Sequence, residues 1–269
     1  MQPLLNIAIR AARRAGEIII RGMNRLHRLD VRAKGQNDFV TEIDMQAERD
    51  IIETIRKPYP SHQILGEETG QSGGNDDEFV WIIDPLDGTT NYLHGFPQFA
   101  VSIGIQRRGR MEHGVVYDPL RQELFTTSRG DGAQLDGKRI RVTQHSSLER
   151  ALIGTGFPYR SNLHWLDNYM AMLKVITQQT AGIRRAGSAA LDLAYVAAGR
   201  LDGFWELGLS PWDTAAGSLL ITEAGGHVGT ITGAEYNQNG HIVAGTPKVY
   251  AALLATLAPH VPNELRSLL

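Results

Sequence analysis

The hydrophobic pattern of the chain changes near residue 147. Before this point, short β-type runs at residues 100–106, 112–117 and 123–127 are separated by Arg-Gly-Arg and Asp-Pro turns, which is typical of an antiparallel sheet. After it, segments with apolar residues at helical spacing alternate with short apolar runs, which indicates helices between strands. The two patterns predict an N-terminal α+β portion, residues 1–147, and a C-terminal α/β portion, residues 148–269, within one compact unit.

Individual elements follow from the same periodicities. Apolar residues at helical spacing predict helices over residues 4–26 and 41–57, and Pro58 stops the second one. The apolar run 79–83 predicts a buried strand that ends at Asp84. The turn-forming stretch 71–78 is expected to be an exposed loop. In the second portion we expect helices at 163–179, 188–198, 212–224 and 247–257, and strands at 151–155, 203–207, 227–230 and 241–244.

The composition excludes several classes of function. The chain has no cysteine, so disulfides, thiolate catalysis and thiolate metal sites are absent, and a reducing cytosol suits it. The histidines are scattered singly, without the spacing of a histidine metal site. A formal net charge of -2 gives no overall field that would draw the protein onto nucleic acid or a membrane. Charged residues interrupt the first twenty positions, so we expect no membrane segment there and a cytoplasmic protein.

Acidic residues directly after the predicted buried strand are the main functional signal. Asp84 and Asp87 flank Pro85 and Leu86. Mg²⁺ prefers oxygen ligands, usually one or two carboxylates together with water and substrate oxygens. Because proline has a fixed φ and no N–H, the Leu86 carbonyl can turn toward the same ion as the two carboxylates. This short turn therefore predicts a chelating metal site.

The residues that follow this turn suit an anion. Gly88 and Thr89 begin a predicted helix, whose free N–H groups and positive dipole end would face a phosphate. Glu67, after a glycine turn, and Asp213, at another predicted helix start, are further acidic candidates. Each feature has a simpler explanation: an ordinary Asp-Pro turn, a solvated loop acid, or a charge favoured by the helix dipole. Their joint occurrence favours the metal site.

Three separated segments resemble the inositol monophosphatase family in order and spacing, and most closely its bacterial SuhB-like branch. The first two are residues 66–69 (Gly-Glu-Glu-Thr) and 81–91 (Trp-Ile-Ile-Asp-Pro-Leu-Asp-Gly-Thr-Thr-Asn). The third is residues 211–226, a segment that begins with Pro-Trp-Asp-Thr. The resemblance covers nearly the whole chain. It implies a layered αβαβα sandwich, with an antiparallel sheet in the N-terminal α+β part and a C-terminal α/β part, and often a homodimer.

The resemblance also implies a reaction, namely hydrolysis of myo-inositol monophosphates and similar small phosphate monoesters by metal-activated water. Two or three Mg²⁺ ions are implied, with catalytic roles for Glu67, Thr89 and Asp84. The implied metal ligands are Glu67, Asp84, the carbonyl of Leu86, Thr89, Asp87 and Asp213, with Asp44 near a third, weaker ion. The implied substrate contacts are Asp87, Gly88, Thr89, Gly187, Ser188, Ala189 and Glu206.

Two alternatives stay open from the residues. Related phosphatases for fructose bisphosphate or a 3′-phosphonucleotide share the acidic motifs, so only a substrate panel separates them. The resemblance also implies a regulatory role in ribosomal RNA transcription complexes with RNA polymerase and Nus factors. Arginine pairs such as Arg107 with Arg108 could form a basic surface for such a role, but no aromatic-interleaved RNA motif accompanies them. Direct nucleic-acid binding is therefore not predicted.

Overall fold

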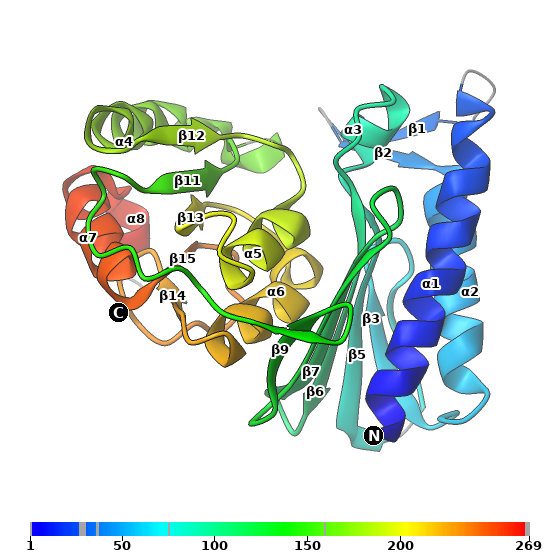
Figure 1. Cartoon of the computed structure of the whole chain (residues 1–269). Coiled ribbons are helices and arrows are strands. Elements are labelled where there is room, and N and C mark those ends of the chain that lie inside the picture. Colours follow the sequence, from blue (N-terminus) through cyan, green and yellow to red (C-terminus); the bar gives the residue numbers. More distant parts are fainter. Residues whose placement is uncertain (1, 27–30, 36–37, 75, 159, 267–269) are drawn as a thin grey trace.

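The protein is layered, with helices and sheets in alternation (Figure 1). The computed structural model describes residues 2–26, 31–35, 38–74, 76–158 and 160–266. Three helix layers enclose two sheets, and they consist of α1 (Pro3–Met23) with α2 (Glu42–Arg56), of α5 (Ala189–Ala197) with α6 (Pro211–Glu223), and of α4 (Leu166–Gln179) with α7 (Pro247–Leu257). The expected αβαβα sandwich is confirmed.

The larger sheet belongs to the first half of the chain. Its strands are β3 (His62–Gly66), β4 (Gly70–Gly73), β5 (Asp76–Asp87), β6 (Ala100–Arg107), β7 (Arg110–Asp118), β8 (Glu123–Ser128), β9 (Gly132–Leu135) and β10 (Lys138–Ile140). Their order is β10-β9-β8-β7-β6-β5-β3-β4, and only β3 and β5 pair in parallel within it. The predicted antiparallel meander is thus confirmed for β6 to β10. A separate hairpin joins β1 (Val31–Gly35) to β2 (Asp38–Thr41), and the short helix α3 (Thr89–Leu93) follows β5.

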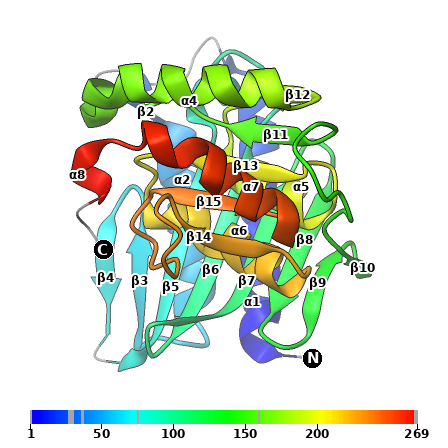
Figure 2. The ribbon, with the colours of Figure 1, turned by 90° about the vertical axis from the view of Figure 1, so that its left-hand side faces the viewer.

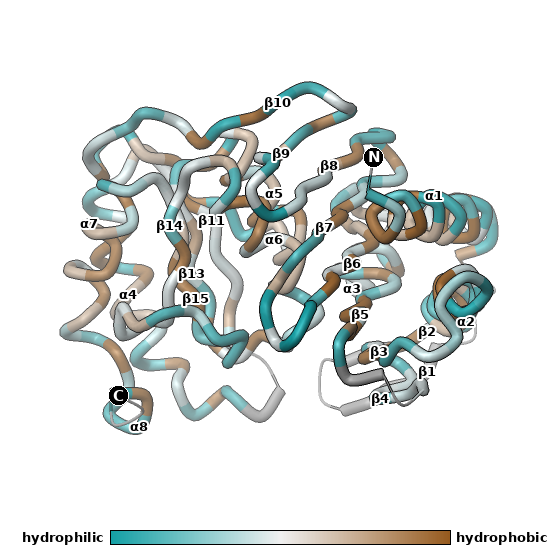
Figure 3. The backbone as a smooth tube through the Cα atoms, turned by 90° about the horizontal axis from the view of Figure 1, so that it is seen from below, coloured by the Kyte–Doolittle hydropathy of each residue, from teal (hydrophilic) through white to brown (hydrophobic). Residues whose placement is uncertain are grey.

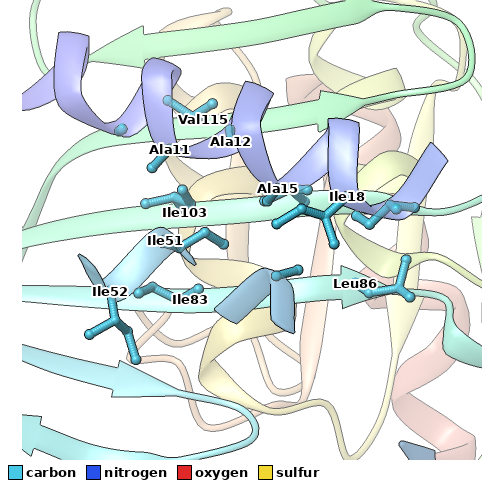
Figure 4. Packing of buried hydrophobic residues seen from close by; sticks show 14 of the residues in the cluster. Ala11, Ala12, Ala15, Ile18, Ile51, Ile52, Ile83, Leu86, Ile103 and Val115 are labelled. Atoms are coloured by element: carbon cyan, nitrogen blue, oxygen red, sulfur yellow. The ribbon is translucent and has the colours of Figure 1, made fainter. Parts of the chain in front are cut away.

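Helix α1 packs on the larger sheet through small side chains. Hydrophobic and hydrophilic residues alternate along it (Figure 3). Figure 4 shows Ala11, Ala12 and Ala15 close to Ile103 and Val115 of the sheet, and all five are fully buried. Alanine favours the helix and lets its backbone come close to the strands. The same face of α1 also buries Ile18 and Ile19. Burial of one isoleucine side chain stabilises the fold by roughly 1.5–3 kcal/mol relative to an exposed one, so this face is sufficient to hold the helix in place.

The smaller sheet belongs to the second half and has the order β12-β11-β13-β15-β14 (Figure 2). Its strands are β11 (Leu152–Thr155), β12 (Gly182–Arg184), β13 (Gly203–Glu206), β14 (His227–Thr230) and β15 (Ile242–Gly245). The remaining elements are 3₁₀ turns at Arg160–Trp165 and Ala258–His260 and the helix α8 (Asn263–Arg266). The expected helices and strands of this half are present, although the first helix begins as a 3₁₀ turn. Among the described residues, no helix is long and apolar enough to cross a membrane.

One expectation was wrong. Residues 71–78 were expected to form an exposed loop, but most of this stretch lies in β4 and at the start of β5. Strand β4 pairs antiparallel with β3 at the edge of the sheet. Its glycine-rich sequence carries almost no hydrophobic signal because backbone hydrogen bonds, rather than buried side chains, hold an edge strand in place.

Helix α6 is pressed against the larger sheet, and this packing brings the two halves of the chain together. A Cβ added to Gly104 of β6 would come 2.8 Å from the Cβ of Ala215, and one added to Gly114 of β7 would come 3.0 Å from the Ala216 carbonyl oxygen. These two glycines therefore create the space in which α6 sits. The hydroxyl of Ser102 also donates to the Trp212 carbonyl at 3.1 Å, which fixes the beginning of α6 beside β6.

Candidate active site

A cavity of about 410 Å³ opens where the end of β5 meets the beginnings of α3, α5 and α6. Every site residue predicted from the sequence lines it, with the exception of Asp44: Glu67, Asp84, Leu86, Asp87, Gly88, Thr89, Gly187, Ser188, Ala189, Glu206 and Asp213. Side chains from both halves of the chain therefore share one site.

Three carboxylates converge in this cavity. One oxygen from each of Asp84, Asp87 and Asp213 lies within 4.8 Å of the others. In a regular strand, residues three apart would face opposite sides of the sheet. The pairing of β5 with β6 is irregular between Asp84 and Asp87, which allows both side chains to reach the same cavity. The Leu86 N–H donates to Asp84 Oδ1 at 2.9 Å and stabilises this turn.

Asp213 is positioned by the capping of α6. The Ser210 N–H donates to Asp213 Oδ2 at 2.7 Å, and serine and aspartate together form a capping box at the N-terminus of the helix. The helix-dipole explanation considered for this residue therefore holds as well, and it does not compete with the metal-site interpretation. The same capping box orients the carboxylate beside Asp84.

Asp87 connects the acidic centre to α5. Its Oδ2 accepts hydrogen bonds from the Ser188 hydroxyl at 2.6 Å and from the Ala190 N–H at 2.8 Å. Burial nevertheless raises the pKa of Asp87 to about 6, because these bonds offset only part of the lost hydration. Burial and the nearby Glu67 also raise the pKa of Asp84 well above its ordinary range. So much buried negative charge in one place is a property of sites that bind a cation.

Thr89 lines the cavity, and Asp44 lies behind it. The Thr89 hydroxyl lies 2.9 Å from Asp44 Oδ1 and 3.1 Å from the Leu86 carbonyl oxygen, and it can donate to either. Asp44 is fully buried, and its Oδ2 accepts from the N–H and the hydroxyl of Thr41 in the capping box of α2. The structure thus places Asp44 against Thr89 rather than in the cavity. Its contact with a metal ion stays a prediction.

A left-handed glycine starts α3. Gly88 has a φ of 96°, and a Cβ at this position would come 2.9 Å from the Gln98 carbonyl oxygen. The side-chain amide of Asn91 donates to the carbonyl oxygens of Gln98 at 2.7 Å and Ala186 at 2.9 Å. It thereby connects α3 to the segment before α5. Sequence reasoning did not single out Asn91, although it ends the Gly-Thr-Thr-Asn motif.

The far side of the cavity contains Glu206, which was predicted as a substrate contact, and two residues that were not predicted there, Asp192 and Arg185. Glu206 at the end of β13 sits against Gly156, whose missing side chain leaves room for the carboxylate. Asp192 is the single acid in the otherwise apolar α5, and this exception was the signal that could have revealed it. Arg185 also lines the cavity, with its Cζ 5.6 Å from the centre of the Phe157 ring.

The donor set suits a hard divalent cation. All the converging groups offer oxygen atoms, and the described residues of the cavity wall include neither histidine nor methionine. Carboxylate and carbonyl oxygens are the ligands that Mg²⁺ prefers, whereas zinc and copper sites usually contain nitrogen or sulfur. The arrangement can therefore hold Mg²⁺ next to a phosphate.

The model of the inositol monophosphatase family matches residues 1–263. The chain belongs to this family. The sequence resemblance is thereby confirmed.

Similar proteins cover the whole chain. This chain is 57% identical to the Nus factor SuhB of Pseudomonas aeruginosa over 270 aligned residues. The alignment covers 99% of this chain and 100% of that relative. The crystal structure of the extragenic suppressor protein suhB from Bartonella henselae has a TM-score of 0.93 at 40% identity, over 97% of this chain and 100% of that one. The inositol monophosphatase from Anabaena (Nostoc) has a TM-score of 0.85 at 40% identity, over 97% and 98% of the two chains.

Proposed function

We propose that this chain is a Mg²⁺-dependent phosphatase that hydrolyses small phosphate monoesters, with myo-inositol monophosphates as the expected substrates. The observation that carries the proposal is the convergence of Asp84, Asp87 and Asp213 in a cavity large enough for a small ester. Membership of the inositol monophosphatase family supports the same reaction.

The acidic residues would hold two or three Mg²⁺ ions. Asp84 would be shared, with Glu67 and the Leu86 carbonyl on one side and with Asp87 and Asp213 on the other. Bound Mg²⁺ would neutralise the phosphoryl oxygens and lower the pKa of a water molecule.

The chain's own residues orient the attack of that water. When the Thr89 hydroxyl donates to Asp44, an oxygen lone pair of Thr89 remains to accept a hydrogen bond from the water. Glu67 lines the same cavity as a second acceptor for the proton. The water oxygen bonds to phosphorus, and the ester oxygen leaves with the electron pair of the broken bond and takes up a proton. The products are the alcohol and inorganic phosphate.

The two ends of the substrate would lie against different elements. Gly88 and Thr89 at the start of α3 would offer backbone N–H groups to the phosphate. Residues 187–189 and Glu206 would contact the alcohol. Asp87 links the two regions through its hydrogen bonds to α5.

A substrate panel tests the proposal. Phosphate release is measured with inositol monophosphates, glycerol 2-phosphate, nucleotide monophosphates and fructose bisphosphate, with and without Mg²⁺. We expect Mg²⁺-dependent turnover that is fastest for the small monophosphates. Faster hydrolysis of fructose bisphosphate or a 3′-phosphonucleotide would favour those alternative activities. The Asp84→Asn variant is expected to lose activity by orders of magnitude, and an unchanged rate would refute the assignment.

A second function is favoured by the relative that is named a Nus factor. We also propose that the chain joins a transcription complex with RNA polymerase and Nus factors in the cytoplasm. Exposed arginines that form no ion pair with another described residue, such as Arg10 and Arg13 on α1, offer a surface for such partners. Expression of Asp84→Asn in a deletion strain tests this role. Rescue would show that it does not need hydrolysis, and failure to rescue would make catalysis necessary.

We further propose a homodimer. Leu163, Leu166 and Met170 are spaced three and four residues apart and are 39%, 41% and 48% exposed. Leu163 lies in the 3₁₀ turn that leads into α4, and Leu166 and Met170 lie in α4 itself. Such a group of exposed apolar side chains is typical of a surface that another chain covers. Light scattering of the Leu166→Glu variant tests this: a dimer in the wild type and a monomer in the variant support the interface, and a wild-type monomer excludes it.

A further inference from the structure

The cavity contains a buried carboxylate that has no role in the reaction described so far. Asp192 on α5 is 2% exposed and lines the cavity together with Glu206 and Arg185. Its backbone N–H donates to the Ser188 carbonyl oxygen at 3.0 Å. Within the described parts of the chain, no group donates a hydrogen bond to its side-chain carboxylate.

The groups around Asp192 do not compensate fully for the burial of its charge. A buried carboxylate without a donor is strongly destabilising, and the usual compensation near a helix start comes from the free N–H groups of the first turn. In α5 the Ala190 N–H already donates to Asp87. Arg185 is exposed to solvent and compensates only part of the charge, because burial and the nearby Asp87 still raise the pKa of Asp192 well above its ordinary range.

Glu206 is in the same situation on the facing strand. It lines the same cavity, and no described residue donates a hydrogen bond to its carboxylate. Burial raises its pKa, and Asp192 is the nearby charge that contributes most. Two neighbouring carboxylates that accept no hydrogen bond from a described residue suit a ligand with several uncharged hydrogen-bond donors, such as hydroxyl groups. A second phosphate at this end would add repulsion instead.

On the basis of the proposed phosphatase function, we infer that Asp192 is a specificity-determining residue whose carboxylate accepts a hydrogen bond from a hydroxyl of the substrate alcohol. Glu206 keeps the alcohol contact that the proposed function already gives it. Asp192 therefore adds to the preference of the site for alcohols that carry free hydroxyl groups on this side of the cavity. Esters of alcohols without such hydroxyls leave Asp192 without a partner.

The experiment compares two esters in the wild type and in Asp192→Asn. The ester myo-inositol 1-phosphate offers neighbouring hydroxyls, whereas p-nitrophenyl phosphate offers none. Removal of one hydrogen bond to a charged group lowers kcat/KM by about 10-fold to 100-fold. We expect this loss for the inositol ester and a change of less than about threefold for the nitrophenyl ester. The Asp167→Asn variant, which removes an exposed acid on α4, is the matched control and should change neither rate.

The outcomes separate the inference from the proposed function. Equal losses with both esters would show that Asp192 only supports the fold or the field of the site, and unchanged rates would show that it does not contact the alcohol; either result overturns the inference. Wild-type protein that hydrolyses neither ester overturns the proposed function together with it. Should Asp192→Asn fail to fold, Asp192→Ser serves in its place. Deoxy-inositol phosphates provide an independent check. The one that lacks the hydroxyl bound by Asp192 should be hydrolysed more slowly than myo-inositol 1-phosphate by the wild type, but at a similar rate by Asp192→Asn.

Discussion

The hydroxyl of Thr89 contacts Asp44, with 2.9 Å between Oγ1 and Oδ1. This bond joins the start of α3 in the cavity to the N-terminus of α2, where Asp44 completes a capping box with Thr41. Because Asp44 is fully buried, it can orient the Thr89 hydroxyl and receive its proton without touching the substrate. The same carboxylate therefore supports both the fold and the proposed chemistry.

The two roles of Asp44 can be separated. We expect Asp44→Asn to lower kcat by about 100-fold or more with little change in KM, because an amide does not accept the proton. The control is Thr41→Ala, which removes the cap at a cost of about 1 kcal/mol but keeps the bond between Thr89 and Asp44. Steady-state kinetics at a temperature where both variants are folded gives the answer. Equal loss of activity in the two variants would assign Asp44 a structural role only.

Removal of one buried charge should stabilise the protein when metal is absent. Asp84 is 1% exposed and lies among like charges. In EDTA, Asp84→Asn is therefore expected to melt at a higher temperature than the wild type. With Mg²⁺ at about 100 times its dissociation constant, the wild type gains about 2.7 kcal/mol and the variant much less. Calorimetry with and without Mg²⁺ measures both effects, and equal gains would contradict the ligand assignment.

The pKa of Asp87 predicts a pH dependence of stability. Its pKa rises from an ordinary value of 3.8 to about 6 on folding, so the folded protein holds this proton more tightly than the unfolded chain. The resulting contribution to the free energy of unfolding is fully present below pH 3.8 and is lost as the pH rises through about 6. In EDTA, Asp87→Asn should therefore gain stability relative to the wild type over this range. Urea unfolding at several pH values checks this, and parallel curves would disprove it.

The space left by Gly156 should be necessary for the alcohol side of the site. A Cβ at this position would overlap with the Glu206 carboxylate. We expect Gly156→Ala to displace Glu206, to reduce stability by about 1–3 kcal/mol and to lower kcat/KM for myo-inositol 1-phosphate by about 10-fold. The opposite control is Gly109→Ala, which meets no atom within 4 Å but keeps the strain of a positive φ. A kinetic effect of similar size in both variants would show that lost stability, not Glu206, is the cause.

Local sequence predicted most of the elements and failed where the signal was not local. The periodicity of α1 and α2 is visible in the chain because each helix buries one face. The apolar run within β5 is visible because both faces of this strand are buried, with Ile83 on the side of α1 and Ile82 on the side of α6. Strand β4 was missed because its partner β3, and not its own composition, makes it a strand. The domain boundary at residue 147 stays a prediction, although α5 and α6 share one hydrophobic cluster with Ala100, Val116 and Phe125 of the first half.

The sequence by itself determined the chemistry of the site: oxygen donors without thiols, an acidic turn after a buried strand, and a glycine-led helix start. These are properties of short segments, and the family motifs preserve them in order. Only the tertiary structure decided which acids meet. The packing of α6 on Gly104 and Gly114 brings Asp213 to Asp84, and the burial of α2 turns Asp44 toward Thr89. The same packing leaves Asp192 in the cavity without a protein donor, because distances between remote segments depend on how whole layers fit together.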